Sequence, residues 1–386
     1  MVSKRQKFRR NAGGEGSTVS TQKITRRGWL KTGAAAVTLT GLAGCLGDDV
    51  EDVSLTFQGF GTHVDAMSNM ADDFEEETGI SIEVAPFQDD WQVLARQRAG
   101  GGDLDLFQMS MRAVPSARDD ELIQPIRVEN VPNVENIQDR FQPENAPWEP
   151  EAGTWWAIAS HFGSNSLAWN TEEWPLDEEP TSWMDLLDPE LQGDVGYSQR
   201  PNYAVCTTYL QHWPNEPRQF EENYETRIEQ VWESLENDWK PQVGVWFEGG
   251  AQANQAFANA NVVAGHQFPV IVKTLQNDGH PIDDVIPEEG AFTYLDGMAI
   301  PDGVEDPKRE AAERFINYSL NPANREEYLE MVPTGTTFDI PEEYQSEGYK
   351  TNTAVQYQDR LEIFDPVFVG SKADEWTSRI QEILRA

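Results

Sequence analysis

The chain has 386 residues, with 67 acidic against 29 basic residues and a formal net charge of −38. A surface so rich in carboxylates repels phosphate backbones, which excludes nucleic acid as a partner. A hydrophobic content of 38% with 13 Trp allows sizeable cores, and a chain of this length normally divides into two domains.

The excess of acidic residues indicates that the protein works in concentrated salt. Residues 1–44 contain nine Lys and Arg and one acidic residue, so the rest of the chain has 20 basic against 66 acidic residues, a formal net charge of −46. At molar salt the Debye length falls to about 3 Å, which removes most of the self-repulsion. We therefore expect that the protein comes from an extreme halophile, namely a halophilic archaeon. A binding surface for a cationic partner is the weaker alternative, because the carboxylates spread along the whole chain.

The N-terminal segment has the three-part build of an export signal: a basic start, an apolar middle and a small-residue cleavage site. Arg26-Arg27 resembles the twin-arginine export motif, and Leu42-Ala43-Gly44-Cys45 resembles a lipobox. The charge-free run Thr32–Gly44 is shorter than the about 20 residues that a membrane span needs. We expect residues 1–44 to be a twin-arginine lipoprotein signal peptide and Cys45 to be lipid-modified, so that the mature chain is anchored at the outer face of the membrane. The alternative is a basic tail ahead of an ordinary helix.

Residues 45–52 form an acidic tether, after which strands and helices alternate. Apolar residues at i, i+3, i+4 and i+7 mark one face of a helix, and alternation of strands with helices predicts a parallel sheet with right-handed crossovers. The expected elements are a strand at Val53–Phe57, a helix with Met67, Met70, Ala71 and Phe74 on one face and Gly79 as its C-terminal cap, a strand through Ile80, Ile82 and Val84, a helix with Asp90 as N-cap that ends at Gly100–Gly102, and a strand at 104–109.

Six prolines between Pro115 and Pro150 predict turns. Asp306 and Pro307 suit the N-cap and first position of a helix that ends at Leu320. With Cys45 assigned to the lipid, Cys206 lacks a disulfide partner and is expected to be a small buried residue. The other expected elements are helices at Trp183–Leu187, Tyr203–Trp213 and Glu221–Asn237, and strands at Val195–Tyr197, Val243–Phe247, Val262–Phe268 and Tyr294–Ile300.

Several segments, in order along the chain, resemble the solute-binding proteins of ABC importers, in particular the spermidine/putrescine-binding branch. These segments are FEEETGISIEV (Phe74–Val84), DLDLFQMSM with LIQPI (Asp103–Ile126), AIASHFGSNSLAWNT (Ala157–Thr171), PTSWMDLLDPELQGDV (Pro180–Val195), and PIDDVIPEEG with YLDGMAIP (Pro281–Pro301). Their order and spacing cover nearly all of residues 53–340. The resemblance implies an α/β two-lobe periplasmic-binding-protein fold of type II, with two crossover strands and a ligand cleft between the lobes.

The resemblance also implies how the chain divides and what it does. Lobe 1 would contain residues 53–162 and 296–342, and lobe 2 residues 163–295 and 343–386, with crossovers near His161–Ser166 and Tyr294–Gly297. Because few strands cross, the lobes can close on a solute by a hinge motion. The implied protein is no enzyme and needs no cofactor; it is a monomer that delivers a small-molecule solute to the transmembrane subunits of an ABC permease. Coupling to a chemoreceptor is an open alternative.

In polyamine binders of this branch, carboxylates bind the ammonium groups and aromatic rings sandwich the methylene chain. Each cation–ring contact contributes about 0.5 to 2 kcal/mol. The resemblance assigns the ligand carboxylate to Asp296 and two aromatic walls to Tyr294 and Phe268. Ordinary core packing is the alternative for the two rings.

The chain departs from this pattern where polyamine binders carry an acidic pair, because Arg200 and Tyr203 stand there, and Arg112 stands at a ring-bearing position. Arg200 also lies where a strand gives way to a helix, whose positive end favours an anion. Glu248-Gly249-Gly250 is another such turn. Guanidinium groups suit carboxylate, phosphonate or sulfonate groups. The solute is thus a polyamine by family or a small organic anion by its arginines, unless these pair with surface carboxylates such as Asp119.

The sequence contains no pattern that is typical of a catalytic site or a metal site. The five histidines show no short ligand spacing, so we expect no metal site. A nucleophile elbow and a phosphate-binding glycine loop are also missing, and we assign no catalytic residue. The alternative from another class is a secreted carbohydrate-active hydrolase, because the 13 Trp and many carboxylates could line a sugar cleft. Such an enzyme needs two cleft carboxylates about 5 to 9.5 Å apart, one with a raised pKa.

Overall fold

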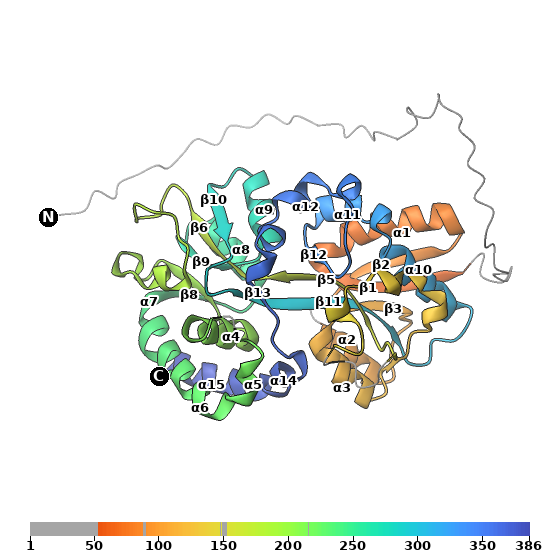
Figure 1. Cartoon of the computed structure of the whole chain (residues 1–386), viewed down its shortest axis with the longest axis horizontal. Helices are drawn as coiled ribbons and strands as arrows, with labels where there is room; N and C mark the ends of the chain where they lie inside the picture. Colours follow the sequence, from red (N-terminus) through yellow and green to blue (C-terminus); the bar gives the residue numbers. More distant parts are fainter. Residues whose placement is uncertain (1–52, 88–89, 147, 149–152, 215) are drawn as a thin grey trace, which may run out of the picture. The chain divides into compact units, whose positions relative to one another are not determined.

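The computed structural model describes residues 53–386 except 88–89, 147, 149–152 and 215. Within these ranges the strands form two sheets, one of eight strands and one of five (Figure 1). The predicted export signal and Cys45 lie outside the described residues. None of the described helices combines the length and the apolar composition that a membrane span requires.

The first sheet starts from alternating strands and helices. Its first elements are β1 (Ser54–Phe60), α1 (Val64–Thr78), β2 (Ser81–Phe87), α2 (Asp90–Arg98) and β3 (Leu106–Ser110). Strand β1 pairs in parallel with both β2 and β3. Helix α1 buries its predicted apolar face, and Gly79 ends it in the left-handed conformation with a φ of 78°. The predicted parallel sheet and its first helix are therefore confirmed.

Later segments of the chain complete the first sheet. They are β4 (Ile123–Gln124), β5 (Ile158–Ser164), β11 (Ala291–Pro301), β12 (Gly335–Thr336) and β13 (Leu361–Glu362). The sheet order is β12-β5-β11-β3-β1-β2, and β4 and β13 also pair with β11. Helices α3 (Val114–Asp119), α10 (Lys308–Ser319) and α11 (Glu326–Met331) belong to the same half of the described chain, which we name lobe 1.

The second sheet, with its helices, forms lobe 2. Its strands are β6 (Ser166–Asn170), β7 (Val195–Ser198), β8 (Val243–Phe247), β9 (Ala264–Gln267) and β10 (Ile282–Val285), in the order β10-β6-β9-β7-β8. Its helices are α4 (Pro201–His212), α5 (Gln219–Glu222), α6 (Tyr224–Ser234), α7 (Lys240–Gln242), α8 (Gly250–Ala258), α9 (Pro269–Asn277) and α15 (Ala373–Arg385).

The two sheets share one topology. In each, the first strand lies between the second and the third, and a strand that arrives from the other part of the chain lies next to the third and antiparallel to it. That arriving strand is β11 in lobe 1 and β6 in lobe 2. The chain passes directly from β5 through Asn165 into β6 and returns along β11, which pairs with β5 (Figure 1). This is the predicted two-lobe type II architecture with its crossover strands.

Short helices connect the remaining segments. The other α-helices are α12 (Glu347–Thr351), α13 (Thr353–Gln356) and α14 (Pro366–Ser371). The 3-10 helices are Gly61–His63, Met111–Ala113, Val128–Asn130, Pro132–Asn136, Asp139–Phe141, Trp183–Leu187, Pro189–Leu191, Pro322–Asn324, Glu342–Tyr344 and Gln358–Arg360, and Leu235–Trp239 is a π-helix. The proline-rich segment therefore contains short helical turns as well as irregular chain.

Each lobe has its own hydrophobic core. The core of lobe 1 contains Phe57, Phe107 and Phe315 from three different elements. The core of lobe 2 contains Trp183, Trp239 and Trp376, and all three side chains are fully buried. Cys206 lies buried in this second core, as predicted, and the described residues contain no disulfide partner for it. A further cluster around Phe247 and Phe257 also belongs to lobe 2, and neither lobe 2 cluster shares a buried residue with the core of lobe 1. This separation allows the lobes to move as units.

Three predicted helix boundaries are wrong. Asp306 does not cap α10, which begins at Lys308, because its carboxylate binds the guanidinium of Arg127. The single helix predicted at Glu221–Asn237 is divided into α5, α6 and the π-helix, and Pro241, which cannot donate a backbone hydrogen bond, follows the π-helix. Asp90 is the first residue of α2 and not its N-cap.

Candidate ligand-binding site

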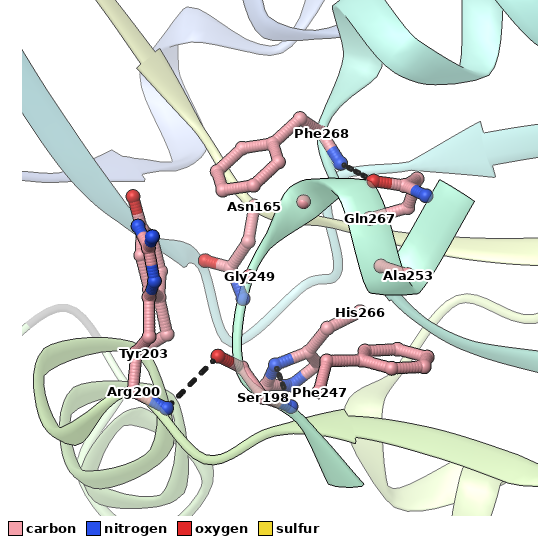
Figure 2. Close-up of a pocket in the computed structure, with 11 residues that line it drawn as sticks. Asn165, Ser198, Arg200, Tyr203, Phe247, Gly249, Ala253, His266, Gln267 and Phe268 are labelled. Atoms are coloured by element: carbon pink, nitrogen blue, oxygen red, sulfur yellow. Dashed lines mark hydrogen bonds between the residues drawn. The ribbon is translucent and has the colours of Figure 1, made fainter. Parts of the chain in front are cut away.

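A pocket of about 300 Å³, including the open space at its mouth, lies in lobe 2 where three parallel strands end. Strands β7, β8 and β9 end at Ser198, Phe247 and Gln267, and the helices that follow them, α4, α8 and α9, begin at this edge of the sheet. The lining residues are Asn165, Ser198, Arg200, Tyr203, Phe247, Gly249, Gly250, Ala253, His266, Gln267 and Phe268 (Figure 2).

The three helices all begin without a side-chain cap. Arg200, Gly249 and Phe268 are the N-cap residues of α4, α8 and α9, and none of them forms a side-chain cap hydrogen bond. The first backbone N–H groups of a helix have no partner inside the helix, although α4 and α9 each lack one of these groups because they begin with Pro201 and Pro269. Three such N-termini with their positive dipole ends therefore favour an anionic group in this pocket.

Arg200 is held at the start of α4 by its neighbours. Its backbone N–H donates to Ser198 Oγ at 3.2 Å, and its Nε donates to the carbonyl of Glu248 at 3.0 Å. Figure 2 shows the first of these bonds at the edge of the pocket. A Cβ atom on Gly249 would lie 3.3 Å from Arg200 Nη2, so the glycine leaves room for the guanidinium. Among the described residues no carboxylate forms an ion pair with Arg200.

Buried polar atoms without a partner surround the same pocket. Asn165 Oδ1, Gln267 Nε2 and His266 Nε2 have no hydrogen-bond partner among the described residues, and these three side chains are at most 3% exposed. His266 Nδ1 accepts a hydrogen bond from the N–H of Ser198, and burial lowers the pKa of this histidine to about 3. The neutral ring thus carries its proton on Nε2. Buried polar groups normally have partners, so these atoms indicate a site for a polar ligand.

Aromatic rings extend from the pocket to strand β11. The rings of Tyr203 and Phe268 meet edge to face at 5.5 Å between centroids, and those of Phe268 and Tyr294 at 6.0 Å. Tyr203 is buried, which raises the pKa of its hydroxyl to about 12, while Arg200 and Arg112 act in the opposite direction and Asp296 in the same direction. The Tyr203 ring thus lies among the charged side chains of both lobes.

The carboxylates lie on the lobe 1 side of these rings. Asp296 of β11 is paired across the sheet with Ser110 of β3, whose backbone N–H donates to Asp90 Oδ2 at 2.9 Å. The pKa of Asp296 is raised to about 8, mainly by burial and also by the Asp90 carboxylate, while Arg112 and a hydrogen bond with Ser110 act in the opposite direction. Two buried carboxylates so close together favour a cation between them.

His161 also approaches Asp296, with its Nε2 at 4.0 Å from Asp296 Oδ2. Burial holds the pKa of His161 well below its ordinary value, and nearby His63 and Arg325 act in the same direction. The ring is therefore neutral at pH 7, and its contact with Asp296 is not an ion pair.

The six predicted ligand residues lie in two groups. Arg200, Tyr203 and Phe268 line the pocket, and Tyr294 joins them through its ring contact with Phe268. Asp296 and Arg112 lie outside the pocket lining, on β11 and on the 3-10 helix after β3. Arg112 Nε is buried and has no hydrogen-bond partner among the described residues. Asp119 pairs with Arg118, so it does not neutralise either candidate arginine.

Sequence reasoning missed Asp90, Asn165, Ser198, His266 and Gln267 as parts of this region. Ser198 and Gln267 are the last residues of β7 and β9. In open α/β sheets ligands bind at the carboxyl ends of parallel strands, so these two positions could have been predicted from the strand boundaries. The predicted strand-to-helix turn at Glu248-Gly249-Gly250 is confirmed, and its two glycines line the pocket.

Comparisons with known proteins agree with the fold of this chain. The family model described as "Bacterial extracellular solute-binding protein" matches residues 69–356. The chain is similar to a spermidine/putrescine-binding periplasmic protein of Haemophilus influenzae, at 23% identity over 67% of this chain and 68% of that protein. Two solved structures have the same fold, each with a TM-score of 0.70 and coverage of 86% of this chain and 100% of the other: a lipoprotein of Treponema pallidum at 17% identity, and a periplasmic binding protein of A. tumefaciens in complex with glucopine at 20% identity.

Proposed function

The chain belongs to the family of extracellular solute-binding proteins, and from this premise we propose that it is the lipid-anchored receptor of an ABC importer for a small charged organic solute. The solute enters between the lobes, the lobes close by a hinge motion, and the permease subunits receive it from the closed form. The members of this family are non-enzymatic transport components, so a carbohydrate-active hydrolase is not favoured.

The pocket at the carboxyl ends of β7, β8 and β9 carries this proposal. It combines a guanidinium held by backbone contacts, three uncapped helix N-termini and buried polar atoms without partners. Ligand sites combine a concave surface with a few placed polar groups in this way. Arg200, Tyr203 and Phe268 bind the solute from lobe 2, Arg112 and Asp296 bind it from lobe 1, and Tyr294 binds it from the crossover strand β11.

The choice between the two candidate solute classes depends on the charges. The Haemophilus influenzae relative is named for spermidine and putrescine, which supports a polyamine and a role for Asp296. Arg112 and Arg200 support a small organic anion instead, because guanidinium groups bind carboxylates and phosphonates with two hydrogen bonds. We propose that the solute carries at least one anionic group.

The site of action follows from the sequence of the first 45 residues. Arg26-Arg27 and the Leu42-Ala43-Gly44-Cys45 segment support export by the twin-arginine route and lipid attachment at Cys45. We propose that the mature protein, residues 45–386, is a monomer on the outer face of the membrane of a halophilic archaeon. The excess of acidic residues supports this, because their mutual repulsion is screened at molar salt.

Thermal unfolding of residues 46–386 in molar KCl tests the proposal. Polyamines go into one set of samples and small carboxylates, phosphonates and sulfonates into another, and a ligand at about 100 times its Kd adds about 2.7 kcal/mol to the free energy of unfolding. Small-angle scattering on the same samples measures whether the radius of gyration falls when the lobes close. A solute that raises the melting temperature and compacts the protein supports a hinge-closing receptor. No effect from any of these solutes contradicts it.

A further inference from the structure

We propose that the solute is a zwitterion, whose anionic group binds at Arg200 and the three helix N-termini of lobe 2 and whose ammonium group binds between Asp296 and Asp90 of lobe 1. This inference rests on the proposed function and names the chemical class of its solute. It assigns the two ends of one molecule to the two lobes, so that only a closed protein can hold both ends.

Residues of lobe 2 alone bind the anionic end of the proposed solute. The N-termini of α4, α8 and α9 meet at the pocket, and Arg200 extends its guanidinium there without a carboxylate partner among the described residues. Gln267 Nε2 offers a further buried donor without a partner in the described part of the chain. A carboxylate bound here would receive hydrogen bonds from a guanidinium, an amide and backbone N–H groups, which are the groups that anion sites use.

The cationic end is defined by lobe 1. Asp296 is 7% exposed and Asp90 is 1% exposed, and both are linked to Ser110, the first by strand pairing and the second by a backbone hydrogen bond. Asp90 and Asp296 are far apart in the sequence, but the folded chain places both of them next to Ser110. Two carboxylates that approach the same residue repel each other, and an ammonium group that contacts both reduces this repulsion.

Aromatic rings connect the two ends. Tyr203 follows Arg200 by one turn of α4, and Tyr294 precedes Asp296 by two residues on β11, so the two rings mark the two charged ends. Phe268 touches both of them. A series of three rings suits a methylene chain, and the ammonium group gains from contact with the face of Tyr294.

The balance of charges decides between a zwitterion and the two simpler solutes. Arg200 is positively charged and lines the lobe 2 pocket, and Asp296 is negatively charged when ionised and lies on the lobe 1 side of the rings. A zwitterion places an opposite charge beside each of these two residues. A diamine would place a positive charge beside Arg200, and a dicarboxylate would place a negative charge beside Asp296. A zwitterion is therefore the class that both residues accept.

A matched set of probes tests this assignment in molar KCl. The probes are 4-aminobutanoate and 5-aminopentanoate, the diamines and dicarboxylates of the same chain lengths, and an α-amino acid. Isothermal titration calorimetry measures each Kd. We expect an aminocarboxylate to bind at least about tenfold more tightly than the diamine and the dicarboxylate of its length, about 1.4 kcal/mol. A diamine or a dicarboxylate that binds as tightly as every zwitterion in the set overturns the proposal.

Two variants assign the two ends. Arg200→Gln should weaken the aminocarboxylate at least about tenfold while a diamine binds no worse, and Asp296→Asn should weaken the aminocarboxylate to a similar degree while a dicarboxylate binds no worse. Arg385→Gln and Asp278→Asn are the matched controls, because both residues are exposed and neither lines the pocket. Equal losses for all probes in both variants would indicate a general structural effect and contradict the assignment.

The same measurements separate this inference from the proposed function. If a diamine or a dicarboxylate binds tightly and compacts the protein, the receptor function stands and the zwitterion is wrong. If none of the probes binds and the radius of gyration never changes, both are contradicted.

Discussion

The hydroxyl of Tyr294 lies directly over the backbone of Gly163, its partner across strands β11 and β5. A Cβ atom at Gly163 would lie 2.2 Å from the Tyr294 oxygen, far closer than any contact allows. The glycine therefore provides the space in which the ring of Tyr294 lies between Phe268 and Asp296. Because Gly163 is on one crossover strand and Tyr294 on the other, the position of this aromatic wall depends on the pair of strands that joins the lobes.

Gly163→Ala should displace the Tyr294 ring and weaken solute binding by about tenfold, with a loss of about 1 to 3 kcal/mol in the free energy of unfolding from overpacking. Calorimetric titration and urea denaturation measure the two effects. Gly61→Ala is the control, because a Cβ atom there meets nothing within 4 Å. Unchanged affinity in Gly163→Ala would remove Tyr294 from the binding surface.

The raised pKa of Asp296 predicts that affinity for an ammonium group depends on pH. Below about pH 8 the free site holds a proton on this carboxyl, and a cationic group must displace it. Affinity should therefore rise by up to about tenfold per unit as pH rises towards about 8, and level off above it. Titrations in two buffers of different ionisation enthalpy should show proton release at pH 7. Asp296→Asn should abolish both effects, and the idea fails if the wild-type protein binds equally well at pH 6 and pH 8.

The same group gives the free protein a pH-dependent stability with a definite sign. Between its ordinary pKa of 3.8 and its folded value of about 8, the folded chain holds a proton that the unfolded chain has lost. The free energy of unfolding should therefore fall as pH rises through this window, by about 1.4 kcal/mol per unit for this one group. Denaturation curves of the wild type and of Asp296→Asn at a series of pH values give the difference in slope. Parallel slopes would contradict the assignment.

Buried His266 predicts the opposite slope at acid pH. Its pKa falls from 6.5 to about 3 because burial disfavours the charged ring. Below about pH 6.5 the unfolded chain gains a proton that the folded chain does not, so the free energy of unfolding should fall by about 1.4 kcal/mol per unit of decreasing pH. His266→Asn should lose this part of the slope between pH 6 and pH 4.5. Above pH 7.5 the slopes of variant and wild type should coincide, which serves as the control.

The fully buried Glu313 depends on Arg127. Glu313 accepts hydrogen bonds from the backbone N–H and the Nε of Arg127 and from Asn130, and its side chain is 0% exposed. Arg127→Ala should cost about 3 to 5 kcal/mol in the free energy of unfolding, because it leaves a buried carboxylate without its main partner.

Arg118→Ala should cost less than about 1 kcal/mol, since its partner Asp119 is 66% exposed. Urea denaturation of both variants compares the two ion pairs directly. Similar losses from the two substitutions would show that burial does not control the strength of these pairs.

The proposed export route predicts that substitutions at the tandem arginines and at Cys45 block different steps. Arg26→Lys with Arg27→Lys should keep the full-length chain inside the cell, because the tandem arginines are the recognised signal. Cys45→Ser should instead prevent lipid attachment. Cell fractionation with immunodetection locates the chain in each case. A chain of unchanged size and membrane location in both variants would contradict the assignment of residues 1–44.

The local pattern of the sequence predicted most of the elements of the fold. Met67, Met70, Ala71 and Phe74 recur with the period of a helix, and helix propensity and capping act within a few residues of each other, so α1 and Gly79 could be predicted directly. The prediction that Asp306 caps a helix was wrong because it used local sequence alone. The carboxylate of Asp306 binds Arg127, a partner from a distant part of the chain that no local pattern reveals.

The residues of the candidate site divide in the same way. Arg200 could be predicted as a candidate because its strand-to-helix turn is local in sequence. The approach of Asp90 to Asp296, and the meeting of three strand ends around Asn165 and Gln267, were decided by strand pairing between segments far apart in the chain. The sequence alone determines which charges are available and which segments carry them. Only the register and order of the strands in the folded protein decide which charges meet, because electrostatic interaction depends on distance in space and not on distance along the chain.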